Sequence, residues 1–440
     1  MKILILNHNL KEQGNYFRAL KFAQYLADKN HNVTLVTSSD RWYKTRKYYV
    51  GKVYVIESPS WSFVIGIDMG WSPLGLLYRL WLVMKNKYDI VYGFSHKIVD
   101  FIPAYFSKIF KKSFYITDWC DWYGKGGIFV LGKEWIDKNF DLSRFRKFIL
   151  VSYYKMEEYL EEFVPKRADM VSVICKALYN RAIGIGIKEE NLIQLFSGAD
   201  TDSIKPVDKT EARQFIKLNS ILGIPEKQWC DIDVANKCEI NLTPRFTILG
   251  YVANYHFDET LLFEAFSIVC KKNKNVKLLA VGPDFSTRKE KLKELGLSLF
   301  NVSTNNKITP QDNIIYFGRR PFKEIKYFLG ASDILLLPMT DVLANRGRWP
   351  HKTGDYLSSG RPIVVNNVGD IPDIFKGNNA GYIAEPNAED FAFKIIQMIQ
   401  DKDKWEEYGK NTRQVAETVL SWQNIGNKLY HKLKEKISDL

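Results

Sequence analysis

The sequence predicts an α/β protein with two doubly wound, Rossmann-like domains, each built on a parallel sheet covered by helices. Three observations lead to this prediction. A chain of 440 residues exceeds what one ordinary core holds, so two domains are expected. Short apolar runs alternate with helical patterns in both halves, which is typical of parallel sheets. Polar side chains follow several apolar runs, at the carboxyl edge where such sheets bind ligands.

Composition and charge narrow the class of protein. Hydrophobic residues make up 46% and charged residues 26% of the chain, which is typical of a globular protein. The net charge is +13; residues 1–200 hold 29 Lys and Arg against 20 Asp and Glu, and residues 201–440 hold 34 against 30. A basic N-terminal half suits anionic lipid, a phosphorylated substrate or nucleic acid. No nucleic-acid-binding motif accompanies it, so we expect no nucleic acid partner.

Cysteines and the N-terminus bear on the compartment. The five cysteines are an odd number, scattered and without a Cys-x-x-Cys pair, which indicates reduced thiols in a cytosolic protein. Met1 to Asn7 is a short apolar strand that turns polar at once, unlike a signal peptide. We therefore expect a cytoplasmic protein.

The first domain opens with a strand, helix and strand. The strand is Lys2 to Leu6, the helix Tyr16 to Lys29 and the second strand Val33 to Thr37, which is a nucleotide-binding type of unit. The loop and first helical turn between them hold Gly14, Asn15 and Arg18. A glycine there lets the backbone approach a ligand closely, or serves turn geometry alone.

Two stretches suggest contact with a membrane. Arg41 to Lys52 interleaves basic and aromatic side chains, which suits a lipid headgroup region or a solvated loop. Trp61 to Lys85 is more apolar, but Asp68, Pro73 and Arg79 interrupt it, so it cannot span a bilayer. Its helix, from Leu74, is apolar nearly all round and is either buried between domains or lies in a membrane surface.

Polar residues follow the next two strands. Asp89 to Phe94 is followed by His96, and Ser113 to Thr117 by Asp118 and Asp121. The carboxyl ends of parallel strands meet at one edge, so these side chains are candidates for binding hydroxyl groups. Two carboxylates without a third ligand are a weak metal signal, and we expect no metal.

The rest of the first domain and the linker follow. A basic helical region covers Leu142 to Lys166, strands are expected at Asp169 to Ile174 and Leu192 to Phe196, and a turn at Ser197 to Asp200. We place the first domain at residues 1–205, a linker or insertion at 206–244, the second domain at 245–420 and a terminal helix at 421–440.

The alternation restarts in the second domain. After Phe246 the chain reads FTILGYV, a helix from Asp258 to Cys270, VKLLAVG, a helix, NIIYFG and a short helix. A strand from Ile334, a loop, a helix from Pro350 to Gly360 and a strand from Pro362 come next, and the last helix is Trp422 to Lys436.

The loop before the Pro350 helix predicts a nucleotide site. Arg346, Arg348 and Lys352 surround a predicted helix N-terminus, a combination that binds diphosphate. Asp355 lies one turn further on the same face as Lys352, where a carboxylate can accept hydrogen bonds from both ribose hydroxyls. The alternative is a surface ion pair on a helix that only packs the sheet.

Two such domains in tandem resemble the GT-B glycosyltransferases, and in particular the large retaining family four, the glycosyl transferases of group 1. The resemblance covers nearly the whole chain. The stretches that carry it are the Gly14 to Arg18 loop, LYNRAIGIGI from Leu178, SGAD at Ser197 to Asp200, GYVANYH, LLAVGP, IIYFGRR, ASDILLLP and PHKTGDYLSSGRPIVVNNVGD. It implies that the C-terminal domain binds a sugar nucleotide without metal or cofactor, that the N-terminal domain binds the acceptor, and that the terminal helix crosses back onto the first domain.

The resemblance also assigns residues. Asp355 stands where the family has the glutamate that holds the ribose, and Gly347 stands where it has a glutamate that contacts the donor sugar. Asn254 and Glu259 stand where it has an arginine and a lysine that bind phosphate. Two cations and one carboxylate of the family pattern are therefore missing.

Substitute cations are present. Arg319, Arg348 and Lys352 are available, and the Arg-x-Pro-x-Lys spacing at Arg348, Pro350 and Lys352 is similar to that of a subgroup that carries its cations there. The expected charge-stabilising and catalytic residues are Lys352, Arg348 and His96. The expected nucleotide-sugar residues are Asp355, Arg319, Gly318, Tyr316, Asn254, Asn345, Arg346 and Pro350. The expected acceptor or sugar residues are Gly14, Asn15, Arg18, Asp118 and Asp121.

These residues together predict a retaining hexosyltransferase that acts on a nucleoside-diphosphate sugar and a hydroxyl acceptor, on a lipid-linked or cell-envelope glycan, with peripheral contact to the inner face of the plasma membrane. Two alternatives stay open. One is a sugar-nucleotide epimerase or hydrolase of the same fold, which would consume donor without an acceptor. The other is a catalytically silent partner subunit, which the differences at Gly347, Asn254 and Glu259 favour.

Overall fold

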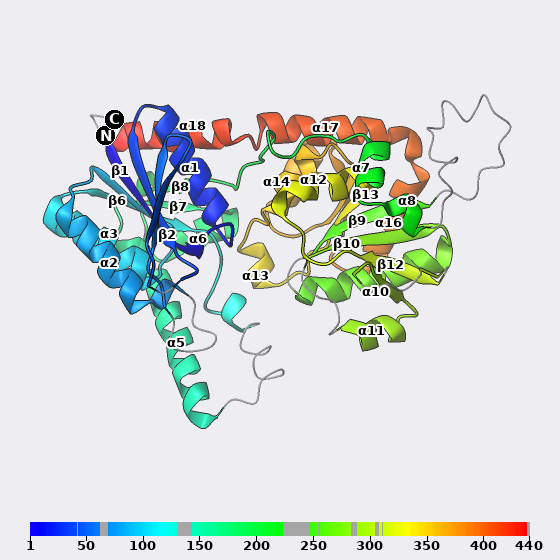
Figure 1. Cartoon of the computed structure of the whole chain (residues 1–440), viewed down its shortest axis with the longest axis horizontal. Helices are drawn as coiled ribbons and strands as arrows, with labels where there is room; N and C mark the ends of the chain where they lie inside the picture. Colours follow the sequence, from blue (N-terminus) through cyan, green and yellow to red (C-terminus); the bar gives the residue numbers. More distant parts are fainter. Residues whose placement is uncertain are drawn as a thin grey trace. The chain divides into compact units, whose positions relative to one another are not determined.

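The structure is a computed structural model, and it contains two parallel α/β units (Figure 1). It describes residues 1–41, 43–61, 69–130, 143–222, 246–253, 256–282, 288–303, 308, 309 and 311–437. The first unit comprises Met1–Gly198, Val342–Trp349 and Trp422–Leu440, and the second comprises Ala199–Asp341 and Pro350–Ser421.

The first unit is built on an eight-stranded sheet of order β3-β4-β2-β1-β5-β6-β7-β8. All neighbouring strands pair in parallel except β3 and β4, which form an antiparallel hairpin at the edge. The strands are β1 Lys2–Leu10, β2 Asn32–Ser38, β3 Arg46–Val50, β4 Val53–Ser58, β5 Ile90–Gly93, β6 Phe114–Trp119, β7 Met170–Val173 and β8 Leu192–Gln194.

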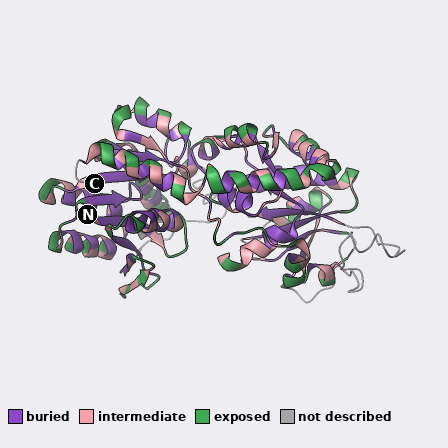
Figure 2. Ribbon diagram, turned by 90° about the horizontal axis from the view of Figure 1, so that it is seen from above, coloured by how far each residue is buried: buried purple, intermediate pink, exposed green. Residues whose placement is uncertain are grey.

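Helices cover both faces of this sheet. On one face α1 and α18 bury an aliphatic and aromatic stripe, and on the other α2 and α3 do so. The helices of this unit are α1 Tyr16–Asp28, α2 Pro73–Lys85, α3 Ile98–Lys111, α5 Arg144–Phe163, α6 Lys176–Gly184, α13 Leu343–Arg346 and α18 Trp422–Lys436. Figure 2 shows the strands buried and the exposed residues on the outer faces of the helices.

The terminal helix α18 packs on α1. The rings of Phe22 and Trp422 meet edge to face at 5.4 Å, and Tyr25 hydrogen-bonds Asn427. A Cβ on Gly426 would lie 2.3 Å from the Tyr25 ring, so only glycine allows the two helices to approach this closely. The last helix therefore completes the core of the first unit, although more than 380 residues separate α18 from α1 in the chain.

Two expectations for the first unit need correction. Within the stretch from Arg41 to Lys52, Arg46–Val50 is a strand and not part of a loop, because it pairs with Val53–Ser58 through a two-residue turn at Gly51, whose φ is +59°. Glu57 ties the hairpin together, since it accepts hydrogen bonds from Arg46 at 3.2 Å and Tyr48 at 2.9 Å. The helix α2 is not buried all round, because it exposes the apolar stripe Leu77, Trp81 and Met84.

The second unit is built on a seven-stranded parallel sheet of order β11-β12-β10-β9-β13-β14-β15. One face is covered by α10 and α16, and the other by α7 and α12. The strands are β9 Thr247–Val252, β10 Val276–Val281, β11 Ser298–Asn301, β12 Asp312–Tyr316, β13 Ile334–Leu337, β14 Ile363–Asn366 and β15 Gly381–Ala384. The helices are α7 Lys209–Phe215, α8 Leu218–Ile221, α10 His256–Lys272, α11 Lys289–Glu294, α12 Phe322–Ala331, α14 Lys352–Ser358, α15 Ile371–Asn378, α16 Ala388–Gln400 and α17 Trp405–Thr418.

Candidate functional site

The strand order of the second unit locates a ligand site. From β9 the chain moves to β10, β12 and β11 on one side, and from β13 to β14 and β15 on the other. The order therefore reverses between β9 and β13, and in open parallel sheets ligands bind beyond the carboxyl ends of the strands at this point. The helix that follows β9 is α10. After β13 the chain forms the short α13, which belongs to the first unit, and then α14 of the second unit.

Lys352 is the first residue of α14 and is held at this edge. Its Nζ donates a hydrogen bond to the carbonyl oxygen of Val252 at 2.6 Å and lies 4.9 Å from the centre of the Tyr251 ring. The backbone N–H of Val252 donates to the hydroxyl of Tyr356 at 2.8 Å. Two side chains of α14 therefore bind the last residue of β9, which places a cation at the switch point.

Asp355 lies one turn further along α14. Its carboxylate is partly buried and makes no hydrogen bond or ion pair with any residue that the structure describes. Burial, and then the nearby Asp200, raise the pKa of Asp355 to about 7. A desolvated carboxylate without a donor is costly, so the site is poised to accept hydrogen bonds from a ligand.

Two glycines and one acidic side chain lie near the carboxyl ends of the neighbouring strands. Gly282 and Gly318 follow β10 and β12 with φ of +138° and +70°, and the N–H of Gly282 donates to the carbonyl of Gly318 at 3.0 Å. Glu259, in the first turn of α10, accepts a hydrogen bond from Arg288 at 3.3 Å. Burial raises the pKa of Glu259, and Arg288 and Lys352 oppose that rise.

The expected nucleotide-sugar residues around β12 differ in their exposure. Tyr316 lies in the core, where its hydroxyl donates to the carbonyl of Gly282 at 2.9 Å. Arg319 is exposed after β12, beside Gly318. Asn254 lies outside the described residues.

Several predicted nucleotide residues belong to the first unit. Asn345 is buried on α13, Arg346 is exposed at its end and Arg348 is buried, whereas Pro350 begins the next segment of the second unit. A Cβ on Gly347 would lie 2.3 Å from the Cβ of Trp122. The space that a longer residue at 347 would need is therefore filled by Trp122.

The loop after β6 that carries Trp122 is firmly fixed. Glu161 of α5 accepts hydrogen bonds from the backbone of Tyr123 and Gly124, both at 2.8 Å, and from Arg181. The Arg181 guanidinium lies 4.4 Å from the centre of the Trp122 ring. Beside Trp122, burial raises the pKa of Asp121 to about 6, which Arg348 opposes.

Predicted acceptor residues meet at the carboxyl edge of the first sheet. Arg18 and Asp118 are fully buried and form a two-pronged ion pair, both contacts at 3.0 Å. Asn15 donates to the carbonyl of Phe94 at 3.0 Å, and Gly14 adopts a φ of +51° against Asn9. Because Arg18 and Asp118 are enclosed and satisfy each other, their geometry is that of a framework that positions the edge.

His96 lies in a second buried cluster. Its Nε2 is 2.8 Å from a carboxylate oxygen of Glu157, which also pairs with Lys97. Sequence reasoning missed Glu157 and Glu161, which both point into the unit from α5. The signal was present, since Tyr153, Glu157, Leu160 and Glu161 follow a helical spacing of three and four residues in an otherwise basic segment.

The chemistry that these groups allow is anion and hydroxyl recognition. The second unit presents a fixed ammonium at Lys352 and an uncompensated carboxylate at Asp355. Within the described ranges, no three His, Cys, Asp or Glu side chains are arranged to hold a metal ion.

Comparison with known proteins finds a family model that matches part of the chain. Residues 244–415 match the family described as Glycosyl transferases group 1. Spore coat protein SA of Bacillus subtilis is 28% identical over 109 residues, which cover 23% of this chain and 29% of that protein. The lipopolysaccharide 1,2-N-acetylglucosaminetransferase of Salmonella typhimurium is 21% identical over 200 residues, 44% of this chain and 50% of that protein. The chain therefore spans half or less of the length of these two relatives.

Solved structures establish the fold over the whole chain. Sucrose-phosphate synthase from Thermosynechococcus elongatus superposes with a TM-score of 0.68 at 13% identity, covering 99% of this chain and 100% of that chain. The Anabaena protein HepE in complex with UDP gives 0.63 at 14%, with the same coverage. WaaG, a glycosyltransferase involved in lipopolysaccharide biosynthesis, gives 0.60 at 15%, covering 97% of this chain and 98% of that chain. The predicted fold class, GT-B, is confirmed.

Proposed function

We propose, on the premise that this chain belongs to the glycosyl transferases of group 1 and has the GT-B fold, that it moves a hexose-type sugar from a nucleoside-diphosphate sugar to a hydroxyl group. The acceptor is a lipid-linked or cell-envelope glycan. The reaction retains the configuration of the sugar. Curated relatives whose names include sugar transfer, such as the Salmonella enzyme, support this class of reaction.

The observation that carries the proposal is the state of Asp355. Its carboxylate is partly buried, lies at the switch point and has no donor among the described residues. The two hydroxyls of a ribose supply the missing donors, and hydrogen bonds to a charged group are the strong ones. Asp355 therefore anchors the ribose of the donor in this proposal.

Lys352 provides the charge for the diphosphate. As bond breaking proceeds, negative charge grows on the leaving diphosphate, and a cation fixed in advance stabilises it without reorganisation. Lys352 meets this requirement because its ammonium is already held by Val252. Arg319, exposed beside Gly318, is the second cation that we assign within the second unit. The roles of Arg348 and His96, which belong to the first unit, stay predictions.

Calorimetric titration tests the donor site directly. UDP, GDP and ADP are titrated at pH 8 into the unchanged chain, Asp355→Ala and Lys352→Gln. We expect one nucleotide to bind in the micromolar range and each substitution to weaken it by about 1.5 to 3 kcal/mol, or roughly tenfold to a hundredfold. The matched control is Asp373→Ala, which removes an exposed carboxylate from α15 of the same unit.

The nucleotide result decides between functions. Binding that Asp355→Ala leaves unchanged would remove the ribose role. The absence of any nucleotide binding would favour the catalytically silent subunit, which the filled space beside Gly347 also supports. A hydrolase or epimerase would consume nucleotide sugar without an acceptor, so donor turnover is measured with and without added glycan lipid.

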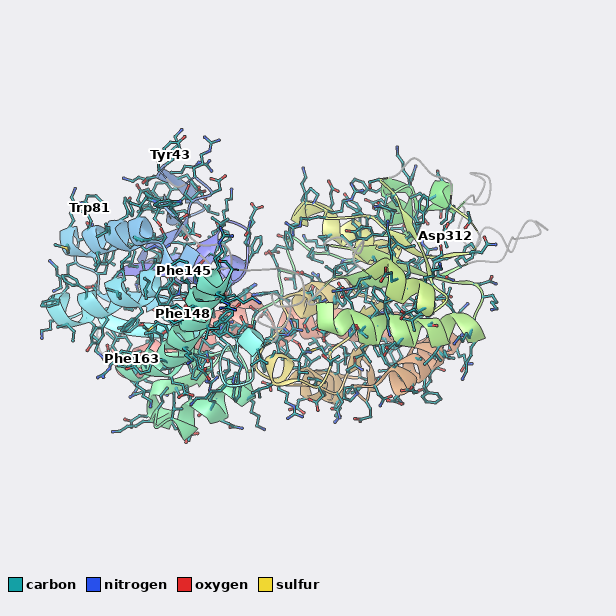
Figure 3. The ribbon with its side chains drawn as sticks, turned by 90° about the horizontal axis from the view of Figure 1, so that it is seen from below. Tyr43, Trp81, Phe145, Phe148, Phe163 and Asp312 are labelled. Atoms are coloured by element: carbon teal, nitrogen blue, oxygen red, sulfur yellow. The ribbon has the colours of Figure 1, made fainter. Side chains whose placement is uncertain are left out.

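The acceptor side of the proposal rests on α5. Phe145 and Phe148 are 71% and 69% exposed (Figure 3). Val151, three residues after Phe148, is also exposed. Between Arg144 and Met156 the helix carries four cations and no acid. Exposed aromatic rings beside Lys and Arg suit the interface of an anionic membrane.

We therefore propose that the first turns of α5 dock on anionic lipid. No helix in the described part of the chain is long and apolar enough to cross a bilayer, so docking would be peripheral. Sedimentation with phosphatidylglycerol vesicles is measured for the unchanged chain, the double variant Phe145→Ser/Phe148→Ser and the control Phe393→Ser, an exposed ring on α16. We expect the double variant alone to stay in the supernatant, and high salt to weaken binding of the others. Equal sedimentation of all three would contradict the proposal.

A further inference from the structure

A separate cavity lies at the opposite edge of the second sheet. Its volume is about 590 Å³, within the usual range of small-molecule sites. Asp333 precedes β13 and Pro362 precedes β14, so the cavity lies at the amino ends of these strands, whereas Lys352 and Asp355 lie on the carboxyl side. The residues that line it and matter below are Lys209, Asp333, Arg361, Lys402, Trp405, Glu406, Lys410, Arg413 and Glu417.

Two cations that line the cavity, Lys209 and Arg361, surround the carboxylate of Asp333 together with Arg213, which does not line it. Lys209 and Arg213 contact the two oxygens of Asp333 at 2.6 and 2.9 Å, and Arg361 interacts with the same carboxylate. Burial lowers the pKa of Lys209 and of Arg361, and the mutual repulsion among these cations adds to it. Asp208 also acts on Arg361, so three positive charges face two negative ones here, and Lys402 on the rim brings the local excess to two.

Arg361 has an unused hydrogen-bond donor. One guanidinium nitrogen donates to the carbonyls of Val207 and Gly330, at 2.8 and 2.6 Å. The Nε is buried and has no acceptor among the described residues. Because this Nε is closed off from solvent, an anion in the cavity would act on Arg361 through the positive charge of its guanidinium, which lines the cavity.

The rim adds a further cation and an aromatic face. Lys410 and Arg413 are each paired, with Glu406 and Glu417, both at 2.6 Å. Lys402 has no ion pair with a described residue, and its Nζ lies 5.9 Å from the centre of the Trp405 ring.

Trp405 offers its ring to the cavity. Its indole N–H is already used, because it donates to the carbonyl of Met398 at 2.7 Å. The ring of Trp405 packs partly against the hydrophobic core and also lines the cavity, where Lys209, Arg361 and Lys402 supply charge.

We propose that this cavity binds a small molecule that carries a phosphomonoester dianion. Two negative charges match the local excess, the phosphate oxygens accept hydrogen bonds from Lys402 and lie beside the Arg361 guanidinium, and the organic part lies against Trp405. The site is distinct from the nucleotide site and does not depend on the proposed transferase activity.

Calorimetry on the full chain tests the proposal. Inorganic phosphate, pyrophosphate and a hexose monophosphate are titrated at pH 7.5 and physiological salt. We expect the hexose monophosphate to bind more tightly than inorganic phosphate, with a dissociation constant below about 1 mM. Lys402→Gln should weaken binding about threefold to tenfold, and Arg361→Gln at least about tenfold.

Matched variants keep the result interpretable. Lys404→Gln is the control, because Lys404 is exposed two residues away in the same short 3-10 helix, Lys402–Lys404, but does not line the cavity. Lys352→Gln tests whether the phosphate binds at the nucleotide site, on the carboxyl side of the sheet, and not in this cavity. If circular dichroism shows that Arg361→Gln does not fold, the Lys402→Gln variant still tests the proposal.

Two results would overturn the proposal. One is the absence of binding by all three phosphates up to about 10 mM, which is weaker than any useful site. The other is binding that Lys402→Gln and Arg361→Gln leave unchanged while Lys352→Gln abolishes it, since this would assign the phosphate to the nucleotide edge. Loss in the cavity variants alone, with Lys404→Gln and Lys352→Gln unaffected, supports it.

Discussion

Replacing Asp355 by Asn should raise stability while it weakens nucleotide binding, because the buried charge of the Asp355 carboxylate destabilises the folded chain. Burial and Asp200 raise the pKa of Asp355 from an ordinary 3.8 to about 7. The folded chain therefore binds more protons than the unfolded chain between those two values. Stability falls as the pH rises through this window, and the full cost is present above pH 7.

The size of the effect follows from the same values. A pKa raised from 3.8 to about 7 lowers the free energy of unfolding by about 4 kcal/mol at pH 8. Asn keeps the shape and removes the charge, so we expect Asp355→Asn to stabilise the second unit at pH 8. The stabilisation should be about 2 to 3 kcal/mol smaller at pH 5, where the wild-type carboxylate is largely protonated.

Nucleotide binding should change in the opposite direction. The carboxylate accepts ribose hydroxyls in its charged form, so UDP affinity of the unchanged chain should fall as the pH drops below about 7. Asp355→Asn should bind UDP weakly at every pH.

Urea denaturation at pH 5 and pH 8, with calorimetry at both, measures the two effects of Asp355→Asn. Asp373→Asn, an exposed carboxylate, is the control. If Asp355→Asn were equally stable at both pH values relative to wild type, the carboxylate would not be desolvated and the reasoning would be refuted.

Two further predictions concern the first unit. Gly347→Ala should lower the free energy of unfolding, measured with urea, by about 1 to 3 kcal/mol, because its Cβ would lie 2.3 Å from the Cβ of Trp122. The control is Gly184→Ala, which should stabilise slightly because nothing lies within 4 Å of the added Cβ. Equal behaviour of the two variants would contradict the contact with Trp122. Asp118→Asn should lower the free energy of unfolding by about 3 to 5 kcal/mol, because it leaves the buried charge of Arg18 without its partner. Arg18→Met combined with Asp118→Leu should cost less than the two single changes together, and a strictly additive double-mutant cycle would show that the pair is not coupled.

Most strands of both sheets could be predicted because apolar runs of four to six residues mark buried parallel strands. The two edge strands of the second sheet, β11 and β15, were not predicted. The hairpin from Arg46 to Ser58 could not be predicted this way. Its first strand is an edge strand with alternating exposure, and its charged and aromatic residues also fit a loop or a membrane surface. Glu57, on the partner strand, decides the matter through its hydrogen bonds to Arg46 and Tyr48.

The candidate site was only partly predictable for a related reason. Lys352 and Asp355 share a helix face, so their spacing indicated one site. The buried pairing of Arg18 with Asp118 joins positions 100 residues apart, and the partner of His96 is Glu157 on another helix. Side chains chosen for ligand chemistry thus turned out to bind one another.

The sequence by itself determined the two parallel α/β units and the switch-point residues Lys352 and Asp355, since periodicity and spacing are local properties of the chain. Tertiary structure alone decided which charges are compensated. Asp355 has no donor among the described residues, Asp118 is fully paired, and Trp122 fills the space beside Gly347. The physical reason is that burial and pairing, which set the cost of a charge or of an added side chain, depend on residues brought together from distant parts of the chain.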